Sequence, residues 1–331
     1  MKRVIILAIL IAAVLPLGVS AQKQVTVLDI PYTLADEFMQ QFVAGVRLYA
    51  KENKNVTLLV EDPQGKVENE ISILESYRSK PVDAVVLYAI DPFAVAPVVK
   101  ELKQKGIKFV AASARFEGQD VGHVTDEWDG GSTAGKMFVE WWTKNRPGEK
   151  AHILSLDFPS NEFANRRNVA FLAYVKQVLG TLVDVVASQE TKGDAELGQK
   201  VTETMLIAHP EINFIFGVND STINGAMAAV ENAGRHDIAY AGIGGEPAAV
   251  KALQKPLYPQ KGGWAFDVGG KMNPVSWGYN MVDAAVKLAR GQKVVELDFS
   301  WTVPVWRENV KDYSVDLNQW RTRAGLKPLQ F

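Results

Sequence analysis

The segment from residue 207 to residue 220 constrains the fold of this chain more than any other stretch. It leads from a helix end into a nearly unbroken apolar run, Phe214 to Val218, as a parallel strand covered on both faces requires. Asn219-Asp220 follows where that strand stops, and ligands bind open α/β sheets at this edge. Asp220 or Ser221 can also be only the N-cap of the next helix. With a cap supplied in that way, the Asn219 amide is expected to face a ligand.

Short apolar strands alternate with amphipathic helices from residue 25 to residue 302, and Asp91-Pro92 marks one helix start. This pattern predicts an α/β protein with two doubly wound parallel-sheet lobes and a ligand cleft between them. The expected strands are 25–30, 56–60, 84–89, 109–113, 121–124, 152–156, 182–187, 213–218, 238–242, 264–268 and 298–302. The expected helices are 36–53, 67–78, 93–104, 130–144, 161–179, 195–208, 221–232, 246–254 and 274–290.

Residues 1–21 have the form of a signal peptide. Lys2-Arg3 precedes an apolar run from Val4 to Leu17, and Val19-Ser20-Ala21 fits a cleavage site. The run is short for a membrane span, although a retained anchor is the alternative. Cleavage after Ala21 is expected, which would place the mature chain in the periplasm or elsewhere outside the cytoplasm.

Composition excludes several classes of function. The net charge of −2 gives no electrostatic basis for binding nucleic acid, and the chain has no cysteine for a disulfide, a thiol nucleophile or a lipid anchor. His123, His152, His209 and His236 are scattered without metal-ligand spacing. No HExxH, P-loop or GxSxG motif occurs. The chain is therefore expected to have no cofactor, no metal and no enzymatic activity.

Several motifs together resemble the periplasmic solute-binding proteins of the ribose and galactose type, over nearly all of residues 25–310. They are Ala208-His209-Pro210 to Asn219-Asp220, Gly106-Ile107 before a strand, Asp126 followed by Gly130-Gly131, Arg167 four residues before Phe171, and Glu308-Asn309-Val310. Such proteins bind a sugar between two lobes and serve ABC importers. The resemblance implies three crossings between lobes, whereas the local pattern alone divides the chain once, near residue 127. It implies an N-terminal lobe of 22–127 and 268–300, and a C-terminal lobe of 128–267 and 301–331.

The resemblance also implies ligand contacts, position by position. Asn219 matches the family's site asparagine, Arg167 its site arginine, and Phe38 an aromatic ring that stacks on the sugar. Asp36 stands where an asparagine is usual, and Met39 where a second aromatic residue is usual.

Other positions depart from the family pattern. Ser113-Ala114-Arg115 replaces an Asp-Arg pair, with Arg115 offset by one, and Gly193 replaces an aromatic residue. Gly244, with Glu246 nearby, replaces an aspartate, and Asp267 is expected at the second hinge. The ligand contacts thus match only in part, which argues for a ligand other than ribose or glucose.

The chemistry of these residues suits a sugar, whose hydroxyls both donate and accept and whose C–H faces are apolar. Arg167 offers a fork of donors, and Asn219, Asp36 and Asp267 offer directional partners. Phe38 and Trp264 can cover a C–H face.

Several of these residues can also have a purely structural role. Phe38 and Trp264 can be core residues, and Arg167 can form a surface ion pair. Glu246 precedes Pro247, where a carboxylate favours a helix start.

The expected function is capture of a neutral monosaccharide or polyol by a monomer, which delivers it to an ABC permease. Presentation of the ligand to a chemoreceptor or sensor kinase is the alternative. A carbohydrate-active enzyme that uses Asp36 and Asp267 is a further alternative. Sugar-responsive repressors share the fold, but here the signal peptide occupies the place of their helix-turn-helix.

Overall fold

The computed structural model describes residues 23–35, 37–270, 273–295, 297–300 and 302–329. The expected signal peptide and Asp36 lie outside the described residues. Among the described residues, no helix is both long and apolar enough to span a bilayer.

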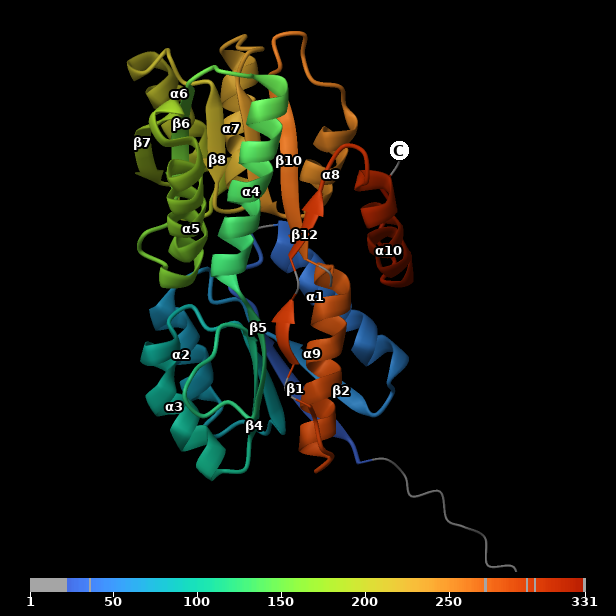
Figure 1. Cartoon of the computed structure of the whole chain (residues 1–331). Coiled ribbons are helices and arrows are strands. Elements are labelled where there is room, and N and C mark those ends of the chain that lie inside the picture. Colours follow the sequence, from blue (N-terminus) through green and yellow to red (C-terminus); the bar gives the residue numbers. More distant parts are fainter. Residues whose placement is uncertain (1–22, 36, 271–272, 296, 301, 330–331) are drawn as a thin grey trace, which may run out of the picture.

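Two six-stranded sheets form the centres of two lobes, which confirms the expected fold class (Figure 1). The sheet of the N-terminal lobe has the order β11-β5-β4-β3-β1-β2 and that of the C-terminal lobe β12-β10-β9-β8-β6-β7. All strand pairs are parallel except β10 with β12. The strands are β1 (Val25–Ile30), β2 (Val56–Val60), β3 (Ala84–Leu87), β4 (Lys108–Ser113), β5 (Val121–Thr125), β6 (Ala151–Asp157), β7 (Val183–Glu190), β8 (Phe214–Gly217), β9 (Ala239–Gly244), β10 (Gly263–Gly270), β11 (Leu297–Ser300) and β12 (Thr302–Val305).

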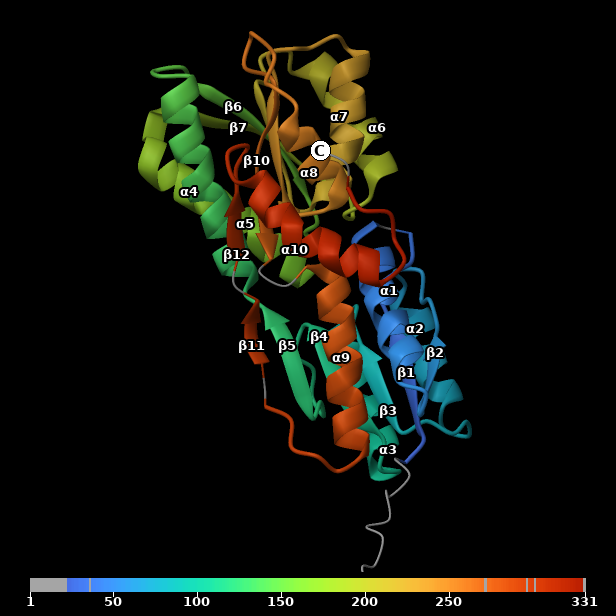
Figure 2. The ribbon, with the colours of Figure 1, turned by 90° about the vertical axis from the view of Figure 1, so that its right-hand side faces the viewer.

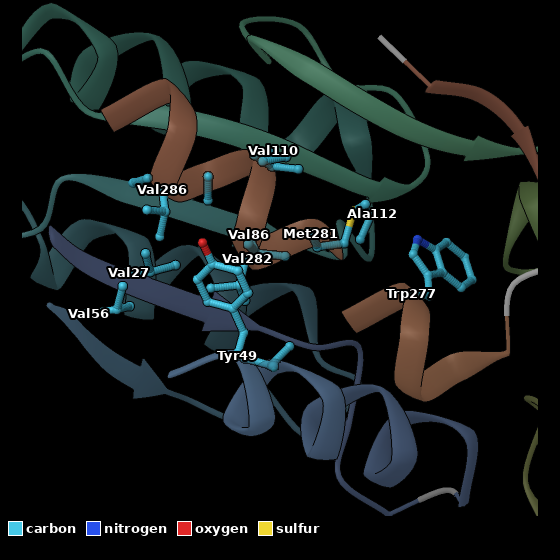
Figure 3. Packing of buried hydrophobic residues seen from close by; sticks show 14 of the residues in the cluster. Val27, Tyr49, Val56, Val86, Val110, Ala112, Trp277, Met281, Val282 and Val286 are labelled. Carbon is cyan, nitrogen blue, oxygen red and sulfur yellow. The ribbon is translucent and has the colours of Figure 1, made fainter. Parts of the chain in front are cut away.

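Helices cover both faces of each sheet, as buried parallel strands require. The helices are α1 (Glu37–Glu52), α2 (Val67–Ser76), α3 (Pro92–Gln104), α4 (Glu127–Asn145), α5 (Glu162–Leu179), α6 (Ala195–Ala208), α7 (Asp220–Asn232), α8 (Pro247–Gln254), α9 (Pro274–Ala289) and α10 (Val310–Arg323), with a 3-10 turn at Gly180–Leu182. In the N-terminal lobe, α1 and α9 pack on one face and α2 and α3 on the other. Figure 3 shows the first of these layers, with Trp277 at the end of the cluster away from Val56.

Consecutive elements lie in different lobes at three points of the chain, from β5 to α4, from β10 to α9 and from β11 to β12. The second of these points comes later than the expected 268, because β10 pairs with β12 as far as Gly270. The expected strand 298–302 is two strands, and each completes the edge of a different sheet. Helix α4 begins before the expected residue 130, because the Asp126 carboxylate accepts from Trp128 N and Asp129 N and caps it. The cap expected at Asp91 is present.

Helix α10, which the sequence pattern did not predict, connects the two lobes by side-chain contacts. Its apolar residues Val310 and Leu317 lie in the core of the C-terminal lobe. Its last turn reaches the N-terminal lobe, where Arg321 Nη1 donates to Gln41 Oε1 at 2.9 Å and Arg323 pairs with Glu52. Figure 2 shows α10 lying across the junction, beside α9 and α1. If the lobes move relative to each other, the contacts of Arg321 and Arg323 must therefore either adjust to the motion or break.

Candidate functional site

A cavity of about 150 Å³ lies between the lobes, where the carboxyl ends of the strands of both sheets meet. This is the place where open parallel sheets bind ligands. The N-terminal lobe contributes Tyr32, Phe38, Met39, Tyr88, Ser113 and Trp277, among others, and the C-terminal lobe contributes Glu127, Phe158, Asn161, Arg167, Asn219 and Glu246, among others. An outer chamber of about 740 Å³ shares Tyr32, Phe158 and Asn161 with it and extends into the cleft.

Arg167 is the central charged group of the cavity. It projects from α5, and its Nε donates to the carboxylate of Glu127, while its Nη1 donates to Val218 O at 3.0 Å. The Arg167 side chain is 20 % exposed and that of Glu127 is 5 % exposed. Because these contacts use Nε and Nη1, Nη2 is left to donate to a ligand. Arg167 is thus both a partner in an ion pair and a cavity residue.

Close packing of α4 on α5 positions Arg167. A Cβ atom on Gly131 of α4 would lie 2.2 Å from the backbone oxygen of Arg167. Only glycine lets the two helices approach so closely at this point. Gly131 therefore fixes the place from which the arginine reaches the cavity.

Asn219 lines the cavity, but the expectation that its amide is free was wrong. Asn219 itself, not Asp220 or Ser221, is the N-cap of α7, and its Oδ1 accepts from Thr222 N at 3.1 Å. Its Nδ2 donates to Gly193 O at 2.9 Å. One side chain thus holds the start of α7 and the loop after β7 together at the cavity.

We expect Asn219→Ala to lower the free energy of unfolding by about 1 kcal/mol, because the cap of α7 is lost. We also expect at least a roughly tenfold loss of ligand affinity, because the loop at Gly193 loses its tether. Urea unfolding and calorimetry measure the two effects. Asp91→Ala removes the cap of α3, which does not line the inner cavity, and should lower stability alone. Equal affinity losses in both variants would contradict a role of Asn219 in the site.

Asp267 does not line the cavity but lies beneath it. It is fully buried, and its oxygens accept from Gly245 N at 3.1 Å and Val268 N at 2.7 Å. Burial and the neighbouring Asp220 carboxylate raise the pKa of Asp267 well above its usual range. Burial also raises the pKa of Asp220, to about 6.

Asp220 and Asp267 support the backbone that carries Glu246. Asp220 Oδ2 accepts from Glu246 N at 2.8 Å. A Cβ on Gly242 or Gly244 would lie 2.3 Å or 2.8 Å from an Asp220 carboxylate oxygen, so glycines are needed in this strand. Glu246 lines the cavity, and its carboxylate accepts from Ser221 Oγ at 3.3 Å.

The remaining expected residues separate into two groups. Phe38, Met39 and Ser113 line the cavity, and Phe38 packs edge-on against Trp277 with ring centroids 5.8 Å apart. Trp264 is 2 % exposed and packs against Tyr240 in the core of the C-terminal lobe. It is therefore a core residue, which was the alternative to a ligand contact. Arg115 is exposed and is not among the cavity-lining residues.

Sequence reasoning missed several lining residues, namely Tyr32, Tyr88, Glu127, Phe158, Asn161, Lys192 and Trp277. Most of them stand one or two positions after a strand. Glu127 follows β5, Phe158 follows β6 and Lys192 follows β7. Their position at strand ends is the signal that could have identified them. Among the described residues, no group of histidine and acidic side chains is arranged to hold a metal ion.

Comparison with known families gives a match to the periplasmic binding protein domain over residues 29–293. Among curated proteins, the chain is 25 % identical over 296 residues to the ribose import binding protein of Escherichia coli, covering 89 % of this chain and 95 % of that protein. It is also 25 % identical over 231 residues to the galactofuranose-binding protein of the same organism, covering 65 % of this chain and 72 % of that protein.

Solved structures share the fold. A periplasmic solute-binding protein of Actinobacillus succinogenes with bound D-allose aligns with a TM-score of 0.74 and 23 % identity, covering 88 % of this chain and all of that one. A solute-binding protein of Bacillus halodurans with bound myo-inositol aligns with a TM-score of 0.76 and 22 % identity, covering 89 % and 98 % of the two chains.

Proposed function

We propose a sugar-capturing role for this chain, which belongs to the periplasmic binding protein family. In this role it encloses a neutral monosaccharide or polyol between its two lobes and delivers it to the permease of an ABC importer. The observation that carries the proposal is the cavity between the strand ends of both sheets, lined by aromatic rings and by an arginine, amides and carboxylates. Rings cover the C–H faces of a sugar, and the polar groups bind its hydroxyls.

The size and charge of the cavity favour a small neutral ligand. Its volume of about 150 Å³ is on the scale of a single small ring molecule. The Arg167 charge is already balanced by Glu127. With Lys192 and Glu246 the described charged side chains of the lining balance, two of each sign, so an anionic ligand would bring an uncompensated charge into the cavity. The curated relatives named above are described as binding ribose and galactofuranose, which are neutral sugars.

Binding without catalysis is part of the proposal. The pair suggested for glycoside hydrolysis was Asp36 and Asp267, and Asp267 is fully buried beneath the cavity. A general acid or base must reach the substrate within hydrogen-bonding distance. We further propose that the protein is exported, that its mature form begins at Gln22, and that it acts as a monomer.

Mass spectrometry of small molecules released by denaturing the purified protein tests the ligand class. We expect a neutral sugar or polyol, and calorimetry should then show binding of that compound to the ligand-free protein. The same titration with amino acids and sugar phosphates serves as the control. Binding confined to the anionic compounds would contradict the proposal.

A further inference from the structure

Ser113 stands at an unusual turn beside the cavity. It is the last residue of β4, and its φ of 75° lies in the left-handed region that residues other than glycine rarely adopt. Ala114 N donates back to Ala112 O at 3.1 Å, so the three residues form a strained γ-turn. Strain of this kind concentrates at functional sites. Here it places a serine that is 5 % exposed in the lining of the cavity.

A chain of side-chain hydrogen bonds runs from Ser113 in the N-terminal lobe to Arg167 in the C-terminal lobe. Ser113 Oγ lies 3.3 Å from Thr125 Oγ1 at the end of β5, and Thr125 Oγ1 in turn bonds to Glu127 Oε1 at the start of α4. The other oxygen of that carboxylate accepts from Arg167 Nε. The hydrogen-bond chain thus follows the step from β5 to α4, where consecutive elements change lobe.

The carboxylate fixes the direction of every bond in this chain. Because the Glu127 carboxylate can only accept, Thr125 must donate its one hydroxyl proton to it. Thr125 then has no proton left for Ser113, so the bond between the two hydroxyls must use the proton of Ser113. The Ser113 oxygen keeps its lone pairs, which can accept a hydrogen bond from a ligand but cannot donate one.

From this order of donors, and resting on the proposed function, we propose that Ser113 determines specificity as an acceptor to which the ligand donates a hydroxyl proton. The ligand class is then a neutral sugar or polyol with a free hydroxyl at this place. A ring oxygen, an ether or a carbonyl there offers only lone pairs and cannot form the bond. Arg167 has N–H groups left to donate after its contacts with Glu127 and Val218 O. A ligand that accepts from Arg167 and donates to Ser113 would close the chain into a ring, in which each bond polarises the next.

Calorimetry with D-ribose, D-allose, myo-inositol and any neutral sugar or polyol released by the purified protein tests the proposal. Each compound that binds is compared with derivatives in which fluorine, which cannot donate, replaces one hydroxyl at a time. At one position we expect fluorine to weaken binding roughly 10-fold or more, and Ser113→Ala to reduce that factor several-fold. If neutral compounds bind, but Ser113→Ala leaves the factor unchanged at every position, the proposed function stands and this inference is overturned. If no neutral sugar or polyol binds, the proposed function fails and the inference fails with it.

A matched pair of threonine variants tests the direction of the chain. Thr125→Val removes the hydroxyl that takes the proton of Ser113, so Ser113 becomes free to donate, and the selectivity against fluorine at that position should fall several-fold. Thr133→Val removes a hydroxyl that also lies 3.3 Å from another threonine hydroxyl, that of Thr302, but within the C-terminal lobe. This control should leave the selectivity unchanged, and thermal unfolding checks that both variants fold. An equal effect of the two variants on the selectivity would overturn the assignment to Ser113.

Discussion

Arg167→Ala is expected to lower the free energy of unfolding by about 3 kcal/mol and to abolish most ligand binding. The variant leaves the Glu127 carboxylate, whose side chain is 5 % exposed, without its cation. It also removes the hydrogen bond to Val218 O and the guanidinium donors that Arg167 offers to a ligand. Urea unfolding and calorimetry measure the two effects separately.

The neighbouring arginine provides the control. Arg166 pairs with Glu162 one helical turn away on the surface of α5, so Arg166→Ala should change stability by about 0.5 kcal/mol or less. Removing both Glu127 and Arg167 should cost less stability than the sum of the single changes, because no unpaired charge remains. Additive losses in this double-mutant cycle would show that the two side chains are not coupled.

Asp29→Asn is expected to remove much of the decline in stability between pH 4 and pH 8. Asp29 is fully buried in β1, and neither carboxylate oxygen has a hydrogen-bond partner among the described residues. Burial raises the pKa of Asp29 to about 8, against an opposing effect of Arg47. Because the native state holds this proton more tightly than the unfolded state, the protonated group favours folding at low pH. That advantage is lost as the pH rises from about 4 to about 8.

A pKa that is raised by about four units lowers the free energy of unfolding by at most about 5 kcal/mol between pH 4 and pH 8. Urea unfolding of both proteins at pH 5 and pH 8 measures the difference in slope. Glu70, whose pKa burial raises to about 8, supplies a second group with the same sign, so Glu70→Gln should reduce the slope further. A steep decline that persists in Asp29→Asn would mean that Asp29 is not the titrating group.

The sequence predicted the strands and most helices because parallel strands buried on both faces leave a strong apolar signal. β1, β2 and α6 lie at the expected residues, and most other elements differ by one to three positions. Helix α10 was missed because it buries few side chains, among them Val310, Ser314 and Leu317. Its place depends on contacts with both lobes, which no local pattern contains.

The site was predicted less completely than the fold. Arg167 and Asn219 line the cavity as the family resemblance implied, but the cap role of Asn219 depends on where α7 begins. Asp267 was expected to face the ligand, yet its backbone partners lie beneath the cavity. Tyr88 and Phe158 come from different lobes, and only the tertiary fold places them around one cavity.

The proposed function requires two lobes that close on a ligand and enclose it. Ligand that contacts both lobes only in the closed state must shift the population toward that state. Small-angle scattering of the ligand-free protein, with and without a saturating amount of the neutral compound found by calorimetry, tests this directly. We expect a smaller radius of gyration with the neutral ligand and no change with a sugar phosphate. An unchanged radius at saturation would contradict closure of the lobes on the ligand.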